Sequence, residues 1–157
     1  MARTPSSHSL ADDYRDLLAA LLGTGARFLI VGAHALSIHG APRATVDLDV
    51  WVEPTTENAR KVWQALVIFG APLDTLGISE ADFTTPDIVA QFGLPPNRID
   101  ILTGVSGLTF GEAWADRLEQ NVDRMTLPFI GRASLIRNKR ASGRKRDLGD
   151  IESLGEE

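Results

Sequence analysis

The chain has 157 residues, of which 43% are hydrophobic and 24% are charged, and this ordinary globular composition argues against a disordered or fibrous protein. It contains no cysteine, which excludes a disulfide scaffold, a thiolate zinc site and a cysteine nucleophile. The net charge of -5 is opposite in sign to that of a general nucleic-acid coat protein.

The hydrophobic pattern predicts one domain over residues 9–157, preceded by a loose polar N-terminus over 1–8. Apolar residues at three- and four-residue spacing, together with glycine stops, predict helices over 10–22, 33–39, 54–67, 110–117, 132–141 and 145–154. Short apolar or alternating runs predict strands over 27–31, 46–52, 87–92, 98–103 and 124–129. Pro128 is expected to place the last strand near a sheet edge. The class is therefore α/β or α+β, with a mixed sheet flanked by helices and a C-terminal helical pair over 132–155.

No apolar run is long enough to cross a bilayer, and the first residues contain no apolar signal core. We therefore expect a cytoplasmic protein with no membrane association.

The most informative stretch is the alternating run that contains Asp47 and Asp49. In a strand these two side chains point to the same face, with their Cα atoms roughly 6.5 Å apart. Two like charges side by side repel, so such a pair needs either a well-solvated face or a cation between them. Oxygen-only ligands suit a hard cation, above all Mg²⁺. The alternative is the polar outer face of an antiparallel sheet.

A third acid, Asp100, is set into the otherwise apolar run Ile99–Leu102. If this strand neighbours the first acidic strand, the three carboxylates converge on one edge. Three carboxylates can hold two divalent ions, an arrangement suited to phosphoryl or nucleotidyl transfer. Taken alone, Asp100 could equally have a structural role.

A glycine turn precedes the acids, because Leu29–Val31 is followed by Gly32 and Ala33 and then by a helix start. Free backbone N–H groups at such a turn suit a phosphate, although glycine is also an ordinary way to turn a corner. The order of this turn, a thirteen-residue gap, Asp47-Leu48-Asp49 and the later Asp100 resembles the nucleotidyltransferase superfamily with a DNA polymerase β-like core.

The resemblance extends to the small nucleotidyltransferases related to the toxins of AbiE-type toxin–antitoxin systems. It is carried by Gly32–Ala35, His39-Gly40, Arg43–Asp49, Ile136–Ala141 and Gly143–Asp150, and it covers residues 28–154. In the first of these segments, Ala33 stands where the family pattern has serine or glycine, so only its backbone N–H could face a phosphate.

The resemblance implies transfer of a nucleoside monophosphate from a nucleoside triphosphate to a hydroxyl on RNA, protein or a small molecule. Asp47, Asp49 and Asp100 would be catalytic and would bind Mg²⁺ or Mn²⁺, and Asp100 would also accept the proton of the attacking hydroxyl. The residues implied in nucleotide binding are Gly32, Ala33, His34, Arg43, Lys139, Arg146 and Asp147. A cognate antitoxin or a partner subunit is a possible partner.

A second hypothesis starts from the basic segment Arg137–Arg146, which holds six of the sixteen Lys and Arg residues and no acid. Such a run is commonly a solvated helix face, but it could also bind phosphates. The chain would then be a catalytically weak module of the same fold that binds RNA or a partner protein. RNA affinity would fall steeply with salt and would not depend on Asp49.

Three nearby side chains have two interpretations each. His34 is more commonly a buried or capping histidine than a ligand. Trp51 shares a strand face with Asp49 and could stack on a base, although packing under a helix is favoured. Arg43 could pair with one of the acids or contact a phosphate.

Overall fold

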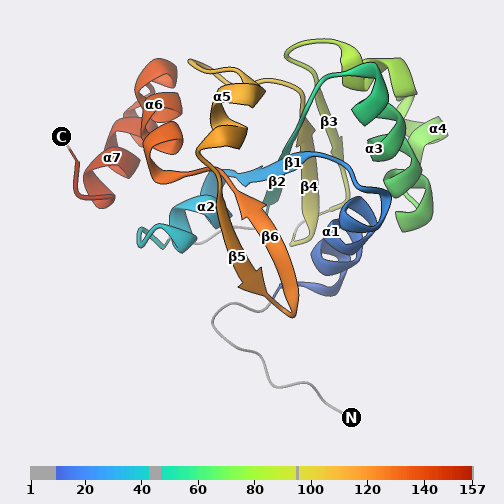
Figure 1. Cartoon of the computed structure of the whole chain (residues 1–157), viewed down its shortest axis with the longest axis horizontal. Helices are drawn as coiled ribbons and strands as arrows, with labels where there is room; N and C mark the ends of the chain where they lie inside the picture. Colours follow the sequence, from blue (N-terminus) through green and yellow to red (C-terminus); the bar gives the residue numbers. More distant parts are fainter. Residues whose placement is uncertain (1–9, 43–46, 95, 157) are drawn as a thin grey trace.

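A computed structural model of the protein describes residues 10–42, 47–94 and 96–156. The predicted loose N-terminus over 1–8 and the site residue Arg43 lie outside these ranges. Within them, six strands form one mixed sheet with the order β3-β4-β2-β1-β6-β5 (Figure 1). The predicted fold class, a mixed sheet flanked by helices, is therefore confirmed.

The strands are β1 Phe28–Val31, β2 Asp47–Val52, β3 Val89–Phe92, β4 Arg98–Leu102, β5 Leu118–Val122 and β6 Met125–Phe129. The helices are α1 Asp12–Thr24, α2 Gly32–Ile38, α3 Thr56–Phe69, α4 Leu73–Leu76, α5 Phe110–Ala115, α6 Arg132–Ser142 and α7 Lys145–Ser153, and a 3₁₀ helix covers Glu80–Thr84. In the middle of the sheet β1 pairs antiparallel with β2, while β2 pairs parallel with β4.

Helices α1 and α3 pack side by side along one side of the molecule, and α6 and α7 pack together on the other (Figure 1). Helix α3 begins where the Thr55 hydroxyl accepts a hydrogen bond from the backbone N–H of Asn58. The buried side chain of Asn58 bonds both the N–H of Arg27, at 2.7 Å, and its carbonyl, at 2.9 Å. This pair of bonds ties the first turn of α3 to the residue before β1.

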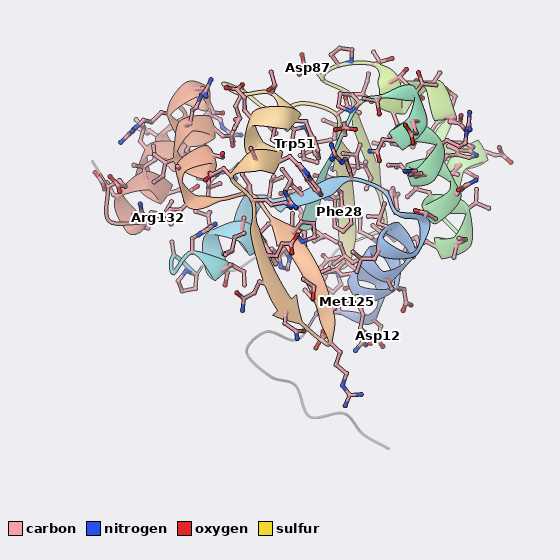
Figure 2. The ribbon with its side chains drawn as sticks, in the orientation of Figure 1. Asp12, Phe28, Trp51, Asp87, Met125 and Arg132 are labelled. Carbon is pink, nitrogen blue, oxygen red and sulfur yellow. The ribbon has the colours of Figure 1, made fainter. Side chains whose placement is uncertain are left out.

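The apolar core is continuous across the sheet and contains Phe28 and Trp51, both 1% exposed (Figure 2). Trp51 meets Phe110 of α5 edge-to-face with ring centroids 5.3 Å apart. Of the two interpretations of Trp51, packing under a helix is thus confirmed. Because Trp51 shares a face of β2 with Asp47 and Asp49, α5 covers the inner end of the acid-bearing face.

Strand β5 and the short helix α4 have no counterpart among the predicted elements. With β6, strand β5 forms a hairpin whose two turn residues, Asp123 and Arg124, both have positive φ angles. Strand β6 lies near a sheet edge, as Pro128 led us to expect, but it is the second strand, with β5 outside it. Strand β6 pairs with β1 only at Phe129, so the ladder tolerates a proline one residue earlier.

Candidate active site

The parallel pairing of β2 and β4 places the three predicted acids on neighbouring strands. The register sets Asp49 opposite Asp100 and Asp47 opposite Arg98, so all three carboxylates lie on one face of adjacent strands. The carboxyl groups of Asp49 and Asp100 are close enough to interact. The strand of Asp100 therefore neighbours the strand of Asp47 and Asp49, as convergence of the three acids requires.

Gly32 leaves the space that the Asp49 carboxylate occupies. Its φ of +68° lies in the left-handed region, which side-chain-bearing residues rarely adopt. A Cβ built on Gly32 would also collide with Oδ2 of Asp49. Glycine is therefore required after β1 for two reasons. One is its backbone conformation, and the other is the space needed by the carboxylate of Asp49, a candidate catalytic residue.

The acids are crowded enough to change their proton affinity. Burial, followed by the charge and hydrogen bond of Asp100, raises the pKa of Asp49 to about 7. Burial and the charges of the three acids also raise the pKa of Tyr14 to about 12. The Tyr14 hydroxyl donates to the carbonyls of Pro96, at 3.1 Å, and Arg98, at 3.2 Å, and so supports the start of β4.

Two neighbours on the sheet already bond the acids. Nη2 of Arg98 lies 2.6 Å from Oδ2 of Asp47, and Nε2 of Gln91 donates to Oδ1 of Asp100 at 2.9 Å. Both follow from strand register, since Arg98 is opposite Asp47 on β4 and Gln91 is opposite Asp100 on β3. Neither residue was identified from sequence, because the pattern of each strand gives no information on its neighbour.

His34 contacts the protein rather than open space in this arrangement. Its ring meets Tyr14 edge-to-face at 5.7 Å, and its side chain is hydrogen-bonded to the backbone of Asp47. Burial lowers the pKa of His34, which favours the neutral imidazole. The predicted nucleotide contact of His34 stays a prediction, whereas its contacts in the structure are with the base of the acidic strand.

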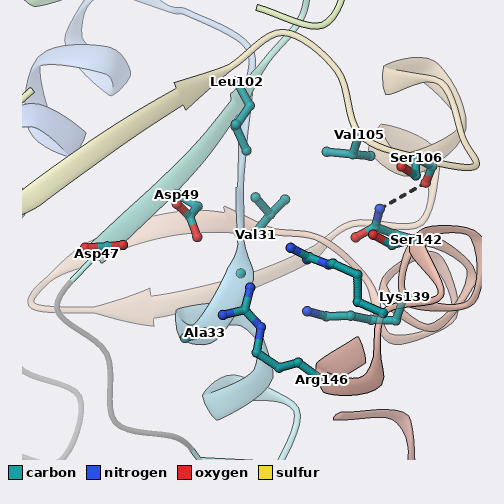
Figure 3. A pocket seen from close by; sticks show the side chains of 13 residues that line it. Val31, Ala33, Asp47, Asp49, Leu102, Val105, Ser106, Lys139, Ser142 and Arg146 are labelled. Atoms are coloured by element: carbon teal, nitrogen blue, oxygen red, sulfur yellow. Dashed lines mark hydrogen bonds between the residues drawn. The ribbon is translucent and has the colours of Figure 1, made fainter. Parts of the chain in front are cut away.

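A cleft of about 580 Å³ opens beside the acids. Asp47 and Asp49 stand on one wall, and Lys139 and Arg146 extend toward the cleft from the opposite wall (Figure 3). The described lining residues are Val31, Gly32, Ala33, Asp47, Asp49, Leu102, Val105, Ser106, Asn138, Lys139, Ser142, Arg144 and Arg146. The cleft therefore joins the predicted glycine turn, two of the acids and two of the predicted cations.

Lys139 forms ion pairs with two buried carboxylates of helix α7. Its Nζ lies 3.3 Å from Oδ1 of Asp147 and 3.1 Å from Oδ2 of Asp150, and Lys139 is only 7% exposed. Although burial alone would raise the pKa of Asp147, the hydrogen bond from Arg144 and the charge of Lys139 hold it well below its usual range. Helices α6 and α7 are thus joined by charges that neutralise one another.

Arg144 and Asp150 had no role in the sequence analysis. The Nε of Arg144 lies 2.7 Å from Oδ2 of Asp147, and the Arg144 side chain is 60% exposed at the rim of the cleft. A possible signal for Asp150 was its spacing, because Asp147 and Asp150 are three residues apart and so share one face of a helix.

Three of the six basic side chains in the segment Arg137–Arg146 pair with acids in the described part of the chain. Arg137 pairs with Glu112 at 2.9 Å, while Lys139 and Arg144 are bound to carboxylates of α7. An electrostatic RNA surface needs cations free to meet phosphates. The structure therefore supports the binding-module hypothesis less than it supports a cleft-centred one.

The carboxylate oxygens of the three acids are suitable ligands for a divalent metal ion, but the side chains are not positioned around one point. Within the described ranges, no three His, Cys, Asp or Glu side chains are grouped closely enough to hold an ion in their present positions. Asp49 and Asp100 lie opposite each other and interact, but Asp47 pairs with Arg98. The donor set is all oxygen, which suits Mg²⁺ or Mn²⁺, and a cation would relieve the repulsion between the carboxylates of Asp49 and Asp100.

None of the described helices is both long and apolar enough to span a membrane. A scan against protein-family models finds no match, and no curated protein sequence matches the chain.

Solved structures do resemble it. The lincosamide antibiotic adenylyltransferase LnuA, bound to lincomycin, superimposes with a TM-score of 0.53 at 14% identity, over 95% of this chain and 98% of that one. A proposed nucleotidyltransferase of Thermotoga maritima superimposes with a TM-score of 0.50 at 13% identity, over 95% of this chain and 92% of that one. At such identities the likeness concerns the fold, and the chain has the fold of nucleotidyltransferases.

Proposed function

We propose that the protein is a metal-dependent nucleotidyltransferase that moves a nucleoside monophosphate from a nucleoside triphosphate to a hydroxyl group. The observation that carries this proposal is the cleft itself, in which carboxylates and cationic side chains face each other from opposite walls. A magnesium–triphosphate complex has matching chemistry, with a hard cation at one end and phosphate oxygens at the other.

Asp47, Asp49 and Asp100 would hold the divalent ions, which when bound would polarise the phosphoryl oxygens and stabilise the developing charge. Arg144 and Arg146 would neutralise the phosphates from the opposite wall. Lys139 is fixed by two carboxylates, so its contribution is a positioned N–H donor more than an unbalanced charge. The backbone at Gly32 and Ala33 lies beside Asp49 and would face the triphosphate.

In the reaction the acceptor oxygen forms a bond to the α-phosphorus, and the bond from that phosphorus to the β-bridging oxygen breaks. Pyrophosphate leaves, and the hydroxyl proton passes to a carboxylate, for which we propose Asp100. RNA, protein and small molecules all offer suitable hydroxyls. One structural neighbour is an adenylyltransferase of a lincosamide antibiotic, which supports including small molecules among the acceptors.

We also propose a relation to AbiE-type toxins, supported by the order of the sequence motifs. A cognate antitoxin or a partner subunit would then contribute to the selection of the acceptor. Because the reaction consumes a nucleoside triphosphate, we place the protein in the cytoplasm, where these substrates are made.

The test is transfer of label from each of the four α-³²P-labelled nucleoside triphosphates to total RNA, to total protein and to lincomycin, in Mg²⁺ and in Mn²⁺. We expect a labelled product that disappears with Asp49→Asn and persists with Asp74→Asn, a matched change at an exposed acid of α4. Absence of transfer to every acceptor, or equal transfer by Asp49→Asn, would contradict the proposal.

A further inference from the structure

One cation of the chain itself sits against the acidic face. Arg98 begins β4 directly opposite Asp47, and its Nη2 lies 2.6 Å from Oδ2 of that carboxylate. The Arg98 side chain is 36% exposed and that of Asp47 is 24% exposed, so the pair is at the border of solvent. A charge-assisted bond of this length is a strong contact of its kind.

This contact divides the three acids into two groups. Asp49 lies opposite Asp100 and the two carboxyl groups interact, and Gln91 donates to Asp100 from β3. Asp47 is instead drawn toward Arg98. The described acids therefore do not gather around one point, although the strands that carry them are adjacent.

We propose that Arg98 is an internal competitor for the metal: a divalent ion shared by the three acids must displace the Arg98 guanidinium from Asp47, so Arg98 sets the metal concentration at which the site assembles. The inference rests on the proposed function, because it assumes that the acids bind a divalent ion. Its physical basis is that the guanidinium and the ion would share one carboxylate, and two cations at that distance repel. Arg98 can leave without burying its charge, because it already reaches solvent.

A purely structural role for Arg98 predicts something different. If the Arg98–Asp47 pair only tied β4 to β2, its loss would lower stability and leave metal affinity unchanged. The proposal predicts the reverse for metal affinity, because the removed cation no longer competes for Asp47.

The experiment measures Mn²⁺ binding to the chelator-treated full chain, without nucleotide, by isothermal titration calorimetry and by loss of the free-ion electron paramagnetic resonance signal. Arg98→Gln should bind Mn²⁺ about two- to fivefold more tightly than the wild type, the range that loss of a partly exposed ion pair implies. Arg98→Lys, which keeps the charge, should lie between the two. Circular dichroism of each variant shows that the comparison is between folded proteins.

Arg27→Gln is the matched control. Arg27 pairs with Glu53 at 3.1 Å beyond the far end of β1 and β2, roughly 20 Å along the strand from Asp47 at the usual rise per residue. The Arg27→Gln substitution removes one positive charge, as Arg98→Gln does, and should leave Mn²⁺ affinity unchanged. A general effect of net charge would instead tighten binding in both variants and would overturn the proposal.

A double-mutant cycle tests whether the effect runs through Asp47. In an Asp47→Asn background, Arg98→Gln should have no further effect on Mn²⁺ affinity, and a persistent tightening there would overturn the inference. Unchanged or weaker Mn²⁺ binding by Arg98→Gln, alongside Asp49-dependent nucleotide transfer, would overturn the inference alone. Absence of Mn²⁺ binding by both the wild type and Arg98→Gln at millimolar concentrations would overturn the inference and the proposed function together.

Discussion

The crowding of Asp49 predicts an unusual dependence of stability on pH. The pKa of Asp49 rises from 3.8 to about 7 on folding, chiefly through burial and then through Asp100. The folded protein therefore keeps a proton that the unfolded chain releases, so its stability should fall as the pH rises from about 4 to about 7. Asp49→Asn removes this titration while an amide can still donate a hydrogen bond to Asp100.

With these two pKa values, ionisation of Asp49 should lower the unfolding free energy by roughly 2–3 kcal/mol between about pH 5 and about pH 8. His34 acts in the opposite direction, because its lowered pKa makes the folded state lose stability as the pH falls below 6.5. Both proteins contain His34, so the difference between wild type and Asp49→Asn isolates the carboxylate.

The assay is urea unfolding of both proteins in chelator at the two pH values. We expect Asp49→Asn to gain stability relative to the wild type by roughly 2–3 kcal/mol on going from about pH 5 to about pH 8. A difference that does not change with pH, or one that favours the wild type at the higher pH, would refute the reasoning that Asp49 is crowded by burial and by Asp100. Asp74→Asn serves as the control and should follow the wild type at both values.

Two further predictions concern the residues around the acids. Gly32→Ala should lower the free energy of unfolding by about 1–3 kcal/mol and abolish transfer, because a Cβ is strained in the left-handed backbone and collides with the Asp49 carboxylate. Urea unfolding and a transfer assay measure the two effects. Full activity of the variant would contradict the prediction. Lys139→Met should lower stability by roughly 3–5 kcal/mol, because it leaves Asp147 and Asp150 buried with less compensation. Arg146→Gln, at an exposed cleft residue, should weaken triphosphate binding and change stability by less than about 0.5 kcal/mol. Equal destabilisation by Lys139→Met and Arg146→Gln would argue against a stabilising role of the buried contacts between Lys139 and the two acids of α7.

The parts of the fold that could be predicted are those with strong local patterns. Strand β2 alternates apolar and polar residues because one face is buried and the other carries the acids, and that alternation is visible in the sequence. Strand β5 has mostly exposed side chains and no such alternation. Its hairpin also turns at Asp123 and Arg124 without a glycine, so neither the strand nor the turn has a recognisable local signal.

The site was predictable to the extent that its chemistry lies within single strands. The spacing of Asp47 and Asp49 and the isolated position of Asp100 could be read directly, and the glycine turn with them. Contacts between strands could not be predicted from the sequence, because they depend on the register of pairing. The roles of Arg98 and Gln91 are therefore visible only in the structure. The burial of Lys139 by α7 is likewise a tertiary effect that a run of basic residues does not reveal.

The most direct test of the central claim, that this cleft binds a metal–triphosphate complex, is calorimetric binding of a non-hydrolysable nucleoside triphosphate with Mg²⁺ and with chelator. We expect binding in Mg²⁺ that weakens by about tenfold or more in chelator, and a similar loss for Asp49→Asn in Mg²⁺. Equal affinity with and without Mg²⁺, or unchanged affinity in Asp49→Asn, would contradict it.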